Sequence, residues 1–136
     1  MELNELLARQ DALPSIPKVL VLLHAELRND EPDLRKICQL VSYDPALAAS
    51  LMRCANGQMP STFRRLGGVS EALAVLSLDQ IRGLVDTASV GTTFASIPGV
   101  NLQQFWRYSL DTAKVARSLA ACVKQNQAMA YSAGLV

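Results

Sequence analysis

The residues that could support catalysis are few and scattered in this sequence. His24 is the only histidine among 136 residues, and it lies within an apolar run. The cysteines Cys38, Cys54 and Cys122 are far apart and form no CxxC pair. A zinc site built from thiolates and imidazoles needs clustered ligands, usually four. We therefore expect no catalytic residue, no metal site and no cofactor, and we interpret the cysteines as reduced, buried thiols.

The carboxylates give no support for acid–base catalysis either. Asp79 and Asp86 lie on one face of an expected helix, but no histidine joins them. Asp44 directly precedes Pro45, and this pair is typical of a helix start. The sequence contains no GxSxG, P-loop or GxGxxG motif. The types and spacing of these residues therefore do not indicate an enzyme.

The basic residues form one small cluster, Arg64 and Arg65, with Arg53 nearby in the sequence. Binding to nucleic acid would need a broader basic stripe, a basic recognition helix or stacking aromatic residues. The whole chain has 13 basic and 12 acidic residues, a net charge of +1. We therefore expect neither a nucleic acid nor a membrane surface as partner, and we interpret the cluster as a solvated loop.

The composition predicts the elements that must position these residues. Half of the residues are hydrophobic, 18% are charged and only 5% are aromatic. Abundant Ala and Leu favour helices over a sheet. We predict one all-α domain over residues 1–136, a compact multi-helix bundle of about seven or eight helices. We see no secretory signal and no apolar run long enough to span a membrane, so we expect a cytoplasmic protein.

Capping residues and apolar spacing set the expected helix boundaries. Asp44, Ser77 with Gln80, and Asn101 each have the residue type that caps a helix start. Asn56-Gly57 is expected to end the helix that begins at Pro45. A turn is expected at 97–99. The predicted helices cover residues 2–9, 18–28, 33–41, 45–55, 69–76, 77–94, 101–124 and 128–136.

The last of these segments stops in the middle of its apolar pattern. We interpret this ending as a C-terminal truncation within the domain. If Val136 is the true terminus, we expect Leu135 and Val136 to be buried by a neighbour. A second copy of the chain, bound through the apolar C-terminal end, is the neighbour that we consider first.

Motifs along residues 13–136 resemble those of the HDOD domain family, the non-catalytic relatives of HD and HD-GYP phosphohydrolases. They are LPSIP at 13–17, YDPAL at 43–47, LMRCANG at 51–57, SEALAVLSLDQIRGLV at 70–85, FWRYS at 105–109 and AGLV at 133–136. The departures are Ser77, where the family usually has Gly, and Gly57, where it usually has Ser. The resemblance implies an HD-domain-like helical fold.

The resemblance also implies that a metal site is missing. In active HD relatives, histidines and aspartates from several helices hold the metal ions. Tyr108 stands where such relatives often place a ligand histidine, and is a degenerate metal-ligand position. A phenol with a pKa of about 10 is a poor metal ligand at neutral pH. The family's His-Asp pair would follow Val136.

The function that the resemblance implies is an output or interaction module in bacterial signal transduction, acting through protein–protein contacts. Asp44, Arg53 and Asn56 belong to the family motifs and are the first candidates for an interaction site. The structural alternatives are a helix cap for Asp44, a carboxylate partner for Arg53 and a helix end for Asn56. The alternative function is a fragment of a metal-dependent HD-type phosphohydrolase.

Overall fold

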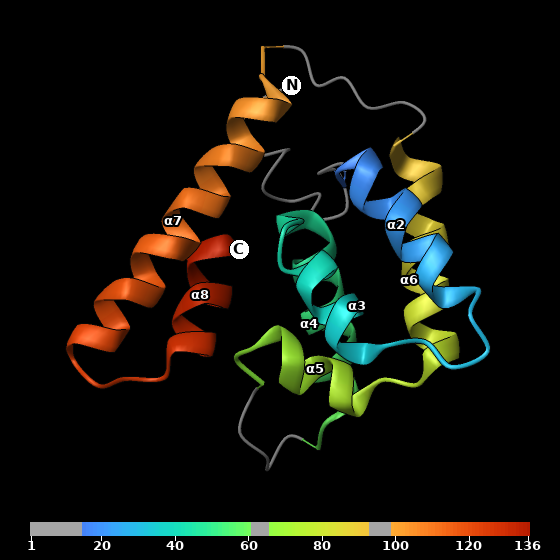
Figure 1. Cartoon of the computed structure of the whole chain (residues 1–136), viewed down its shortest axis with the longest axis horizontal. Helices are drawn as coiled ribbons and strands as arrows, with labels where there is room; N and C mark the ends of the chain where they lie inside the picture. The colour runs from blue at the N-terminus through green and yellow to red at the C-terminus, as the bar shows by residue number, and fades with distance from the viewer. Residues whose placement is uncertain (1–14, 61–65, 93–98) are drawn as a thin grey trace.

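The computed structural model describes residues 15–60, 66–92 and 99–136 (Figure 1). The helix predicted at 2–9, the Arg64–Arg65 cluster and most of the turn at 97–99 lie outside the described residues. Within these ranges the chain forms seven helices and no strand, as the sequence predicts. None of the described helices is both long and apolar enough to cross a membrane. The helices are α2 (Pro17–Leu27), α3 (Leu34–Val41), α4 (Pro45–Gln58), α5 (Val69–Val75), α6 (Leu78–Thr92), α7 (Leu102–Cys122) and α8 (Gln127–Leu135).

Helix starts follow the predicted caps. Asp44 Oδ1 accepts a 3.0 Å hydrogen bond from the Leu47 amide at the start of α4. At α6, Gln80 accepts from the Ser77 amide at 2.9 Å, and the Ser77 hydroxyl accepts from the Gln80 amide at 3.2 Å. This reciprocal pair is the predicted capping box, which satisfies two N–H groups that the helix itself leaves unpaired.

The sequence pattern predicts that helix α4 ends at Asn56-Gly57. This prediction is wrong, because α4 continues to Gln58. The Asn56 side chain is engaged elsewhere, because its Oδ1 accepts from the Leu66 amide at 2.6 Å and its Nδ2 donates to the Leu66 carbonyl at 3.2 Å. Asn56 therefore holds the chain just before α5 instead of forming a left-handed helix end. Helix α7 also ends slightly early, at Cys122, and Lys124 has a φ of 55°.

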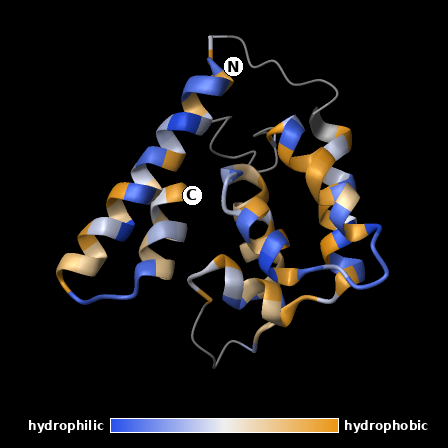
Figure 2. Ribbon diagram, in the orientation of Figure 1, coloured by the Kyte–Doolittle hydropathy of each residue, from blue (hydrophilic) through white to orange (hydrophobic). Residues whose placement is uncertain are grey.

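The hydrophobic core lies among helices α2 to α6, where the apolar faces meet (Figure 2). Its largest fully buried aliphatic side chains from this part are Leu23, Ile37, Leu47, Leu51 and Ile81, drawn from α2, α3, α4 and α6. Burying a side chain of this kind contributes about 1.5–3 kcal/mol, so this group dominates the stability of the body. The body formed by α2 to α6 is thus the platform for the remaining two helices.

Helices α7 and α8 form an antiparallel hairpin beside that body (Figure 1). They approach closely at Gly134, where an added Cβ would lie 2.9 Å from the Ala113 Cα atom. Leu135 at the end of α8 is 1% exposed, because it is buried by its own chain. Its burial needs no neighbour, whereas Val136 is 63% exposed. Assembly of two copies through this end remains a prediction.

Candidate binding cleft

Asp44 is fully buried at the start of α4. Besides capping α4, its Oδ2 accepts a 2.8 Å hydrogen bond from the Ile16 amide. Burial raises the pKa of this carboxyl group, and the hydrogen bonds from Leu47 and Ile16 oppose that rise. Asp44 therefore fastens the segment before α2 to α4, and it presents no surface of its own to a partner.

The other two motif residues lie farther along α4. Arg53 is exposed and donates a hydrogen bond to the Ser50 hydroxyl at 3.3 Å. The Asn56 side chain is hydrogen-bonded to the backbone of Leu66. Arg53 and Asn56 are three residues apart, so they are neighbours on the helix surface. Asp44 is twelve residues before Asn56, roughly 18 Å along the helix axis. The structure therefore does not gather the three predicted residues into one site.

Two other residues singled out in the sequence lie on different helices. Tyr108 is 72% exposed on α7. His24 is half-buried on α2, where its Nε2 lies 2.7 Å from the Ser89 hydroxyl of α6 and its Nδ1 lies 3.7 Å from Asp86 Oδ1. Among the described residues, no group of three or more His, Cys, Asp or Glu side chains is arranged to hold a metal ion.

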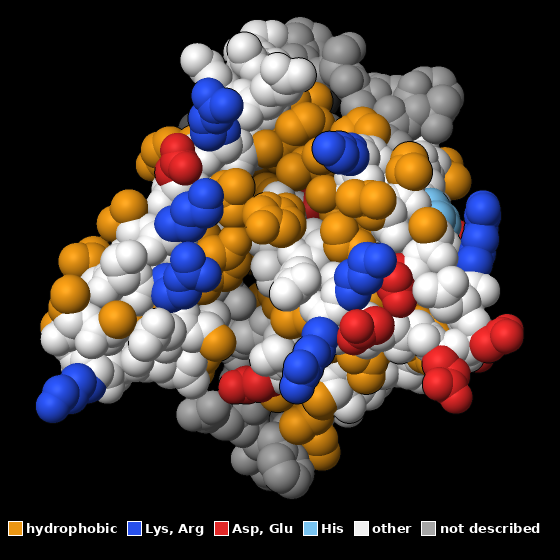
Figure 3. All heavy atoms as spheres, viewed as in Figure 1, with side chains coloured by type: hydrophobic (Ala, Val, Ile, Leu, Met, Phe, Trp, Pro, Cys, Tyr) orange, Lys and Arg blue, Asp and Glu red, His pale blue; other side chains and the backbone are white. Residues whose placement is uncertain are grey.

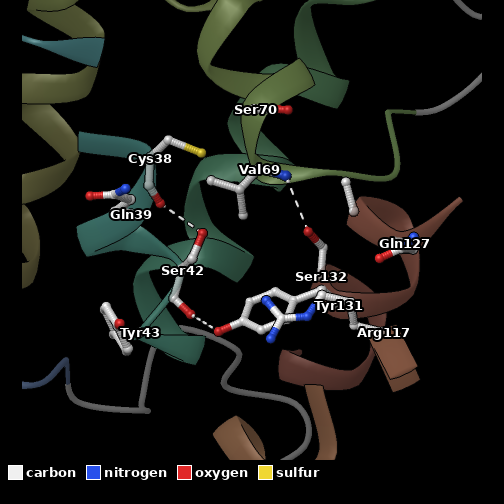
Figure 4. Close-up of a pocket in the computed structure, with 11 residues that line it drawn as sticks. Cys38, Gln39, Ser42, Tyr43, Val69, Ser70, Arg117, Gln127, Tyr131 and Ser132 are labelled. Carbon is white, nitrogen blue, oxygen red and sulfur yellow. Dashed lines mark hydrogen bonds between the residues drawn. The ribbon is translucent and has the colours of Figure 1, made fainter. Parts of the chain in front are cut away.

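A cleft of about 600 Å³ opens between the body and the hairpin (Figure 4). We call it the hairpin cleft. One wall comes from α3, the turn after it and the start of α5, and the other comes from α7 and α8. Its polar lining includes Gln39, Ser42, Ser70, Arg117, Tyr131 and Ser132.

Hydrogen bonds across the hairpin cleft fasten α8 to the body. The Tyr131 hydroxyl donates to the Ser42 carbonyl oxygen at 2.8 Å, and the Ser132 hydroxyl accepts from the Val69 amide at 3.2 Å (Figure 4). The Ser42 hydroxyl in turn donates to the Cys38 carbonyl oxygen at 2.7 Å. The Tyr131 bond reaches the turn after α3, and the Ser132 bond reaches the start of α5. The two bonds together therefore fix the width of the cleft.

The hairpin cleft has one charged side chain among its described lining residues, the cationic Arg117. The Arg117 guanidinium carbon lies 5.1 Å from the centre of the Tyr131 ring, within the range of a cation–π contact. None of the described residues that line the cleft is acidic. Figure 3 shows the hollow between the two halves of the molecule, with Lys and Arg side chains more frequent than acidic ones on the α7 side. This arrangement favours an anionic ligand or partner.

The ionisable groups inside the cleft are poorly suited to catalysis. Burial raises the pKa of the Cys38 thiol, against a smaller opposing effect of its contact with Ser42. Burial also raises the pKa of Tyr131. The charge of Arg117 opposes this rise, and Tyr43 adds to it. Both groups therefore stay protonated at neutral pH, and the reactive thiolate is scarce. The arrangement can bind a ligand but offers it no strong nucleophile or base.

Sequence reasoning missed Arg117, Tyr131 and Ser132. The one available signal is Tyr131, a phenol in an otherwise apolar segment, because the hydroxyl of a buried tyrosine usually finds a hydrogen-bond partner. The partner itself could not be predicted, since Ser42 lies 89 residues away in the sequence.

Comparisons with known proteins match this chain to a family, to a curated relative and to two crystal structures of one regulator. A family model described as "HDOD domain" matches residues 13–136. An uncharacterized protein of Treponema pallidum (strain Nichols) is 25% identical over 130 residues, which cover 94% of this chain and 25% of that protein. The chain thus spans about a quarter of the length of this curated relative.

Two crystal structures of the MmoQ response regulator from Methylococcus capsulatus str. Bath have a similar fold. The first superposes with a TM-score of 0.82 at 22% identity, covering 92% of this chain and 51% of that one. The second, a fragment of the same regulator, has a TM-score of 0.73 at 22% identity and covers 92% and 48%. At this identity the likeness extends to the fold alone, over about half of the regulator.

Proposed function

Because the chain belongs to the HDOD domain family, we propose that it is a non-catalytic output module that binds another protein in bacterial signal transduction, in the cytoplasm. HDOD domains are signalling-associated relatives of the HD phosphohydrolases and generally lack the HD catalytic motif. The lack of catalysis and the protein partner are the parts of the proposal that need support from the chain's own residues.

The observation that carries the proposal is the chemistry of the hairpin cleft. Hydroxyl, amide and guanidinium groups line it, and its thiol and phenol have raised pKa values. A general base works best with a pKa near the operating pH, and a nucleophile needs a neighbouring base or a lowered pKa. The cleft therefore favours binding over turnover.

The residues present do not fit the metal centre of an HD phosphohydrolase. Such a centre needs several imidazole and carboxylate ligands that converge on one point. His24 is the only histidine of the chain, and its ring is held between α2 and α6 by Ser89 and Asp86. Tyr108, at the position of a family ligand, is 72% exposed to solvent. The described residues therefore supply no ligand set that could hold a catalytic metal ion.

A protein partner is supported by the outer face of α7. Tyr108, Val115 and Leu119 on α7, and Val123 directly after its last residue, are each more than half exposed. Their spacing of seven, four and four residues keeps them on one side of the helix. We call this set the α7 stripe. A row of exposed apolar side chains is a surface that an amphipathic partner helix can cover, and a second copy of the chain is one such partner.

The catalytic part is tested with bis(p-nitrophenyl) phosphate and excess Mn²⁺, Mg²⁺ or Fe²⁺, together with elemental analysis of the purified protein. We expect no retained metal and no hydrolysis above that of the free ions. Stoichiometric metal, or metal-dependent hydrolysis that His24→Ala abolishes, would instead support the alternative function. The chain would then be a fragment of a metal-dependent HD-type phosphohydrolase.

The interaction part is tested with Leu119→Lys, which places a charge in the α7 stripe. Ala25→Lys adds the same charge at an exposed position of α2 and serves as the control. We expect partners captured by crosslinking, and any dimer seen by light scattering, to be lost with Leu119→Lys and kept with Ala25→Lys. Retention of every partner by Leu119→Lys contradicts an interaction through this stripe.

A further inference from the structure

The hairpin cleft continues into a second depression between α3 and α5. This depression has a volume of about 400 Å³ and shares Cys38, Gln39 and Ser70 with the cleft. Its remaining lining is mainly aliphatic and consists of Leu34, Leu73, Ala74 and the side chain of Arg35. The two depressions therefore form one groove, with a polar end at Arg117 and an apolar end at Leu34.

The polar end offers a well-placed cation. The Arg117 side chain is exposed, and its guanidinium carbon lies 5.1 Å from the centre of the Tyr131 ring, within the range of a cation–π contact. Arg117 lines the cleft, and a guanidinium presents N–H donors in one plane that match the two oxygens of a carboxylate or phosphate. None of the described lining residues is acidic, so no carboxylate of the lining opposes a bound anion there.

The apolar end sets the shape of the rest of the ligand. Leu34 begins α3 and Ser42 directly follows it, so the groove runs along about 12 Å of helix. Leu34 is 50% exposed and Ala74 is exposed, which leaves aliphatic surface for a ligand to cover. Both volumes lie within the range of about 300–1,000 Å³ that is typical of small-molecule sites.

We propose that this groove binds a small amphipathic anion, with a carboxylate or phosphate head at Arg117 and an aliphatic tail along α3 and α5. The ligand is a free molecule in solution, not a lipid within a membrane. This site is separate from the α7 stripe. A ligand here gives the module a chemical input in addition to its protein partner.

Calorimetric titration with matched probes tests the proposal. Octanoate and octyl phosphate carry both head and tail, 1-octanol lacks the charge, acetate and inorganic phosphate lack the tail, and octylamine reverses the charge. We expect saturable one-to-one binding of the first two, and at least tenfold weaker binding of the others. Amide shifts in NMR spectra should concentrate at Gln39, Ser70 and Tyr131.

Two variants separate the ends of the groove. Arg117→Gln removes the cation of the polar end, while Arg35 remains at the other end, and we expect about tenfold weaker octanoate binding because a charge-assisted hydrogen bond is lost. Lys114→Gln removes the same charge from an exposed position one turn away on α7 and should bind normally. Ala74→Gln fills the apolar end at an exposed helical position and should also weaken octanoate binding, with acetate unaffected. Circular dichroism checks that each variant is folded.

Several results would overturn the proposal. These are no saturable octanoate or octyl phosphate binding at millimolar concentration, equal binding of 1-octanol, or unchanged affinity in Arg117→Gln. Binding to phosphatidylglycerol vesicles without binding to free octanoate would replace the free ligand by a membrane lipid. Leu119→Lys, which disrupts the α7 stripe, should leave octanoate affinity unchanged, so failure of this site is distinguishable from failure of the protein-binding proposal.

Discussion

The Tyr131 hydroxyl donates a 2.8 Å hydrogen bond to the carbonyl oxygen of Ser42, and this contact joins α8 to the turn that precedes α4. Tyr131→Phe removes the bond and leaves the aromatic ring in place. We expect a loss of about 1 kcal/mol in the free energy of unfolding, because a neutral hydrogen bond contributes about that much. We also expect faster amide exchange in α8. Urea unfolding and hydrogen exchange measure the two effects.

Tyr108→Phe is the matched control for this prediction. It removes the same hydroxyl from a side chain that is 72% exposed, and we expect no change beyond about 0.5 kcal/mol. Equal stability of the Tyr131→Phe and wild-type proteins, with unchanged exchange in α8, would show that the Tyr131–Ser42 bond does not hold the hairpin.

Because both carboxylate oxygens of Asp44 accept hydrogen bonds, we expect the free energy of unfolding to fall in steps as they are removed. Asp44→Ala removes the acceptor of both the Leu47 and Ile16 amides, and we expect a loss of about 2 kcal/mol in the free energy of unfolding. Asp44→Asn keeps one acceptor oxygen and a good cap, so its loss should be about half as large. Denaturation at neutral pH gives both values. The control Asp30→Asn, at an exposed position of the turn after α2, should change stability by less than about 0.5 kcal/mol.

Asp44 and Glu26 predict opposite dependences of stability on pH. The folded-state pKa of Asp44 is raised from 3.8 by burial, so its contribution to stability is largest below 3.8 and declines as pH rises through the folded value. The pKa of Glu26 is lowered from 4.5 by hydrogen bonds from the Asp33 amide and Lys36. Its contribution is present above 4.5 and is lost as pH falls through the folded value.

Unfolding curves of variants between acidic and neutral pH distinguish these two signs. As pH falls, the wild type should gain stability relative to Asp44→Asn and lose stability relative to Glu26→Gln. Parallel pH profiles for the wild type and Asp44→Asn would contradict a raised pKa at Asp44. Parallel pH profiles for the wild type and Glu26→Gln would show that the Glu26 charge does not stabilise the junction of α2 and α3.

Two helical glycines predict opposite effects of the same substitution. At Gly134 of α8, a Cβ would lie 2.9 Å from both the Ala113 Cα atom and the Thr112 carbonyl oxygen. These are backbone atoms that cannot move independently, so Gly134→Ala should cost about 1–3 kcal/mol by forcing α7 and α8 apart. At Gly83 of α6, an added Cβ would meet no atom within 4 Å apart from its chain neighbours and its own helix backbone, and Gly83→Ala should stabilise the protein by up to about 1 kcal/mol. Thermal unfolding of both variants gives the comparison.

Local features of the fold could be predicted from the sequence. Asp44 before Pro45 and Ser77 with Gln80 depend on residues within one helical turn, and the helices begin as these pairs predict. Asn56 shows the limit of this reasoning. Its type favours a helix end, but its bonds to Leu66 give the side chain another use, and α4 continues to Gln58. A tertiary contact overrode the local preference.

The candidate site could not be predicted in the same way. Arg53, Asn56 and Tyr108 were chosen for their positions in family motifs, and none of them lines the hairpin cleft. The cleft arises where the turn after α3 meets α8, which are brought together only by the packing of the whole chain. The roles of Arg53 and Asn56 in partner binding remain predictions.

The distribution of the core has a consequence for how the molecule opens. Within the described part of the chain, the buried apolar cluster takes only Ala113 and Leu135 from α7 and α8, and all its other members from the body. Detaching the hairpin therefore exposes little of the body's interior and requires less free energy than global unfolding. Native-state hydrogen exchange should resolve two cooperative units, with the hairpin opening first. A molecule built this way can release one part of its surface while the rest stays folded.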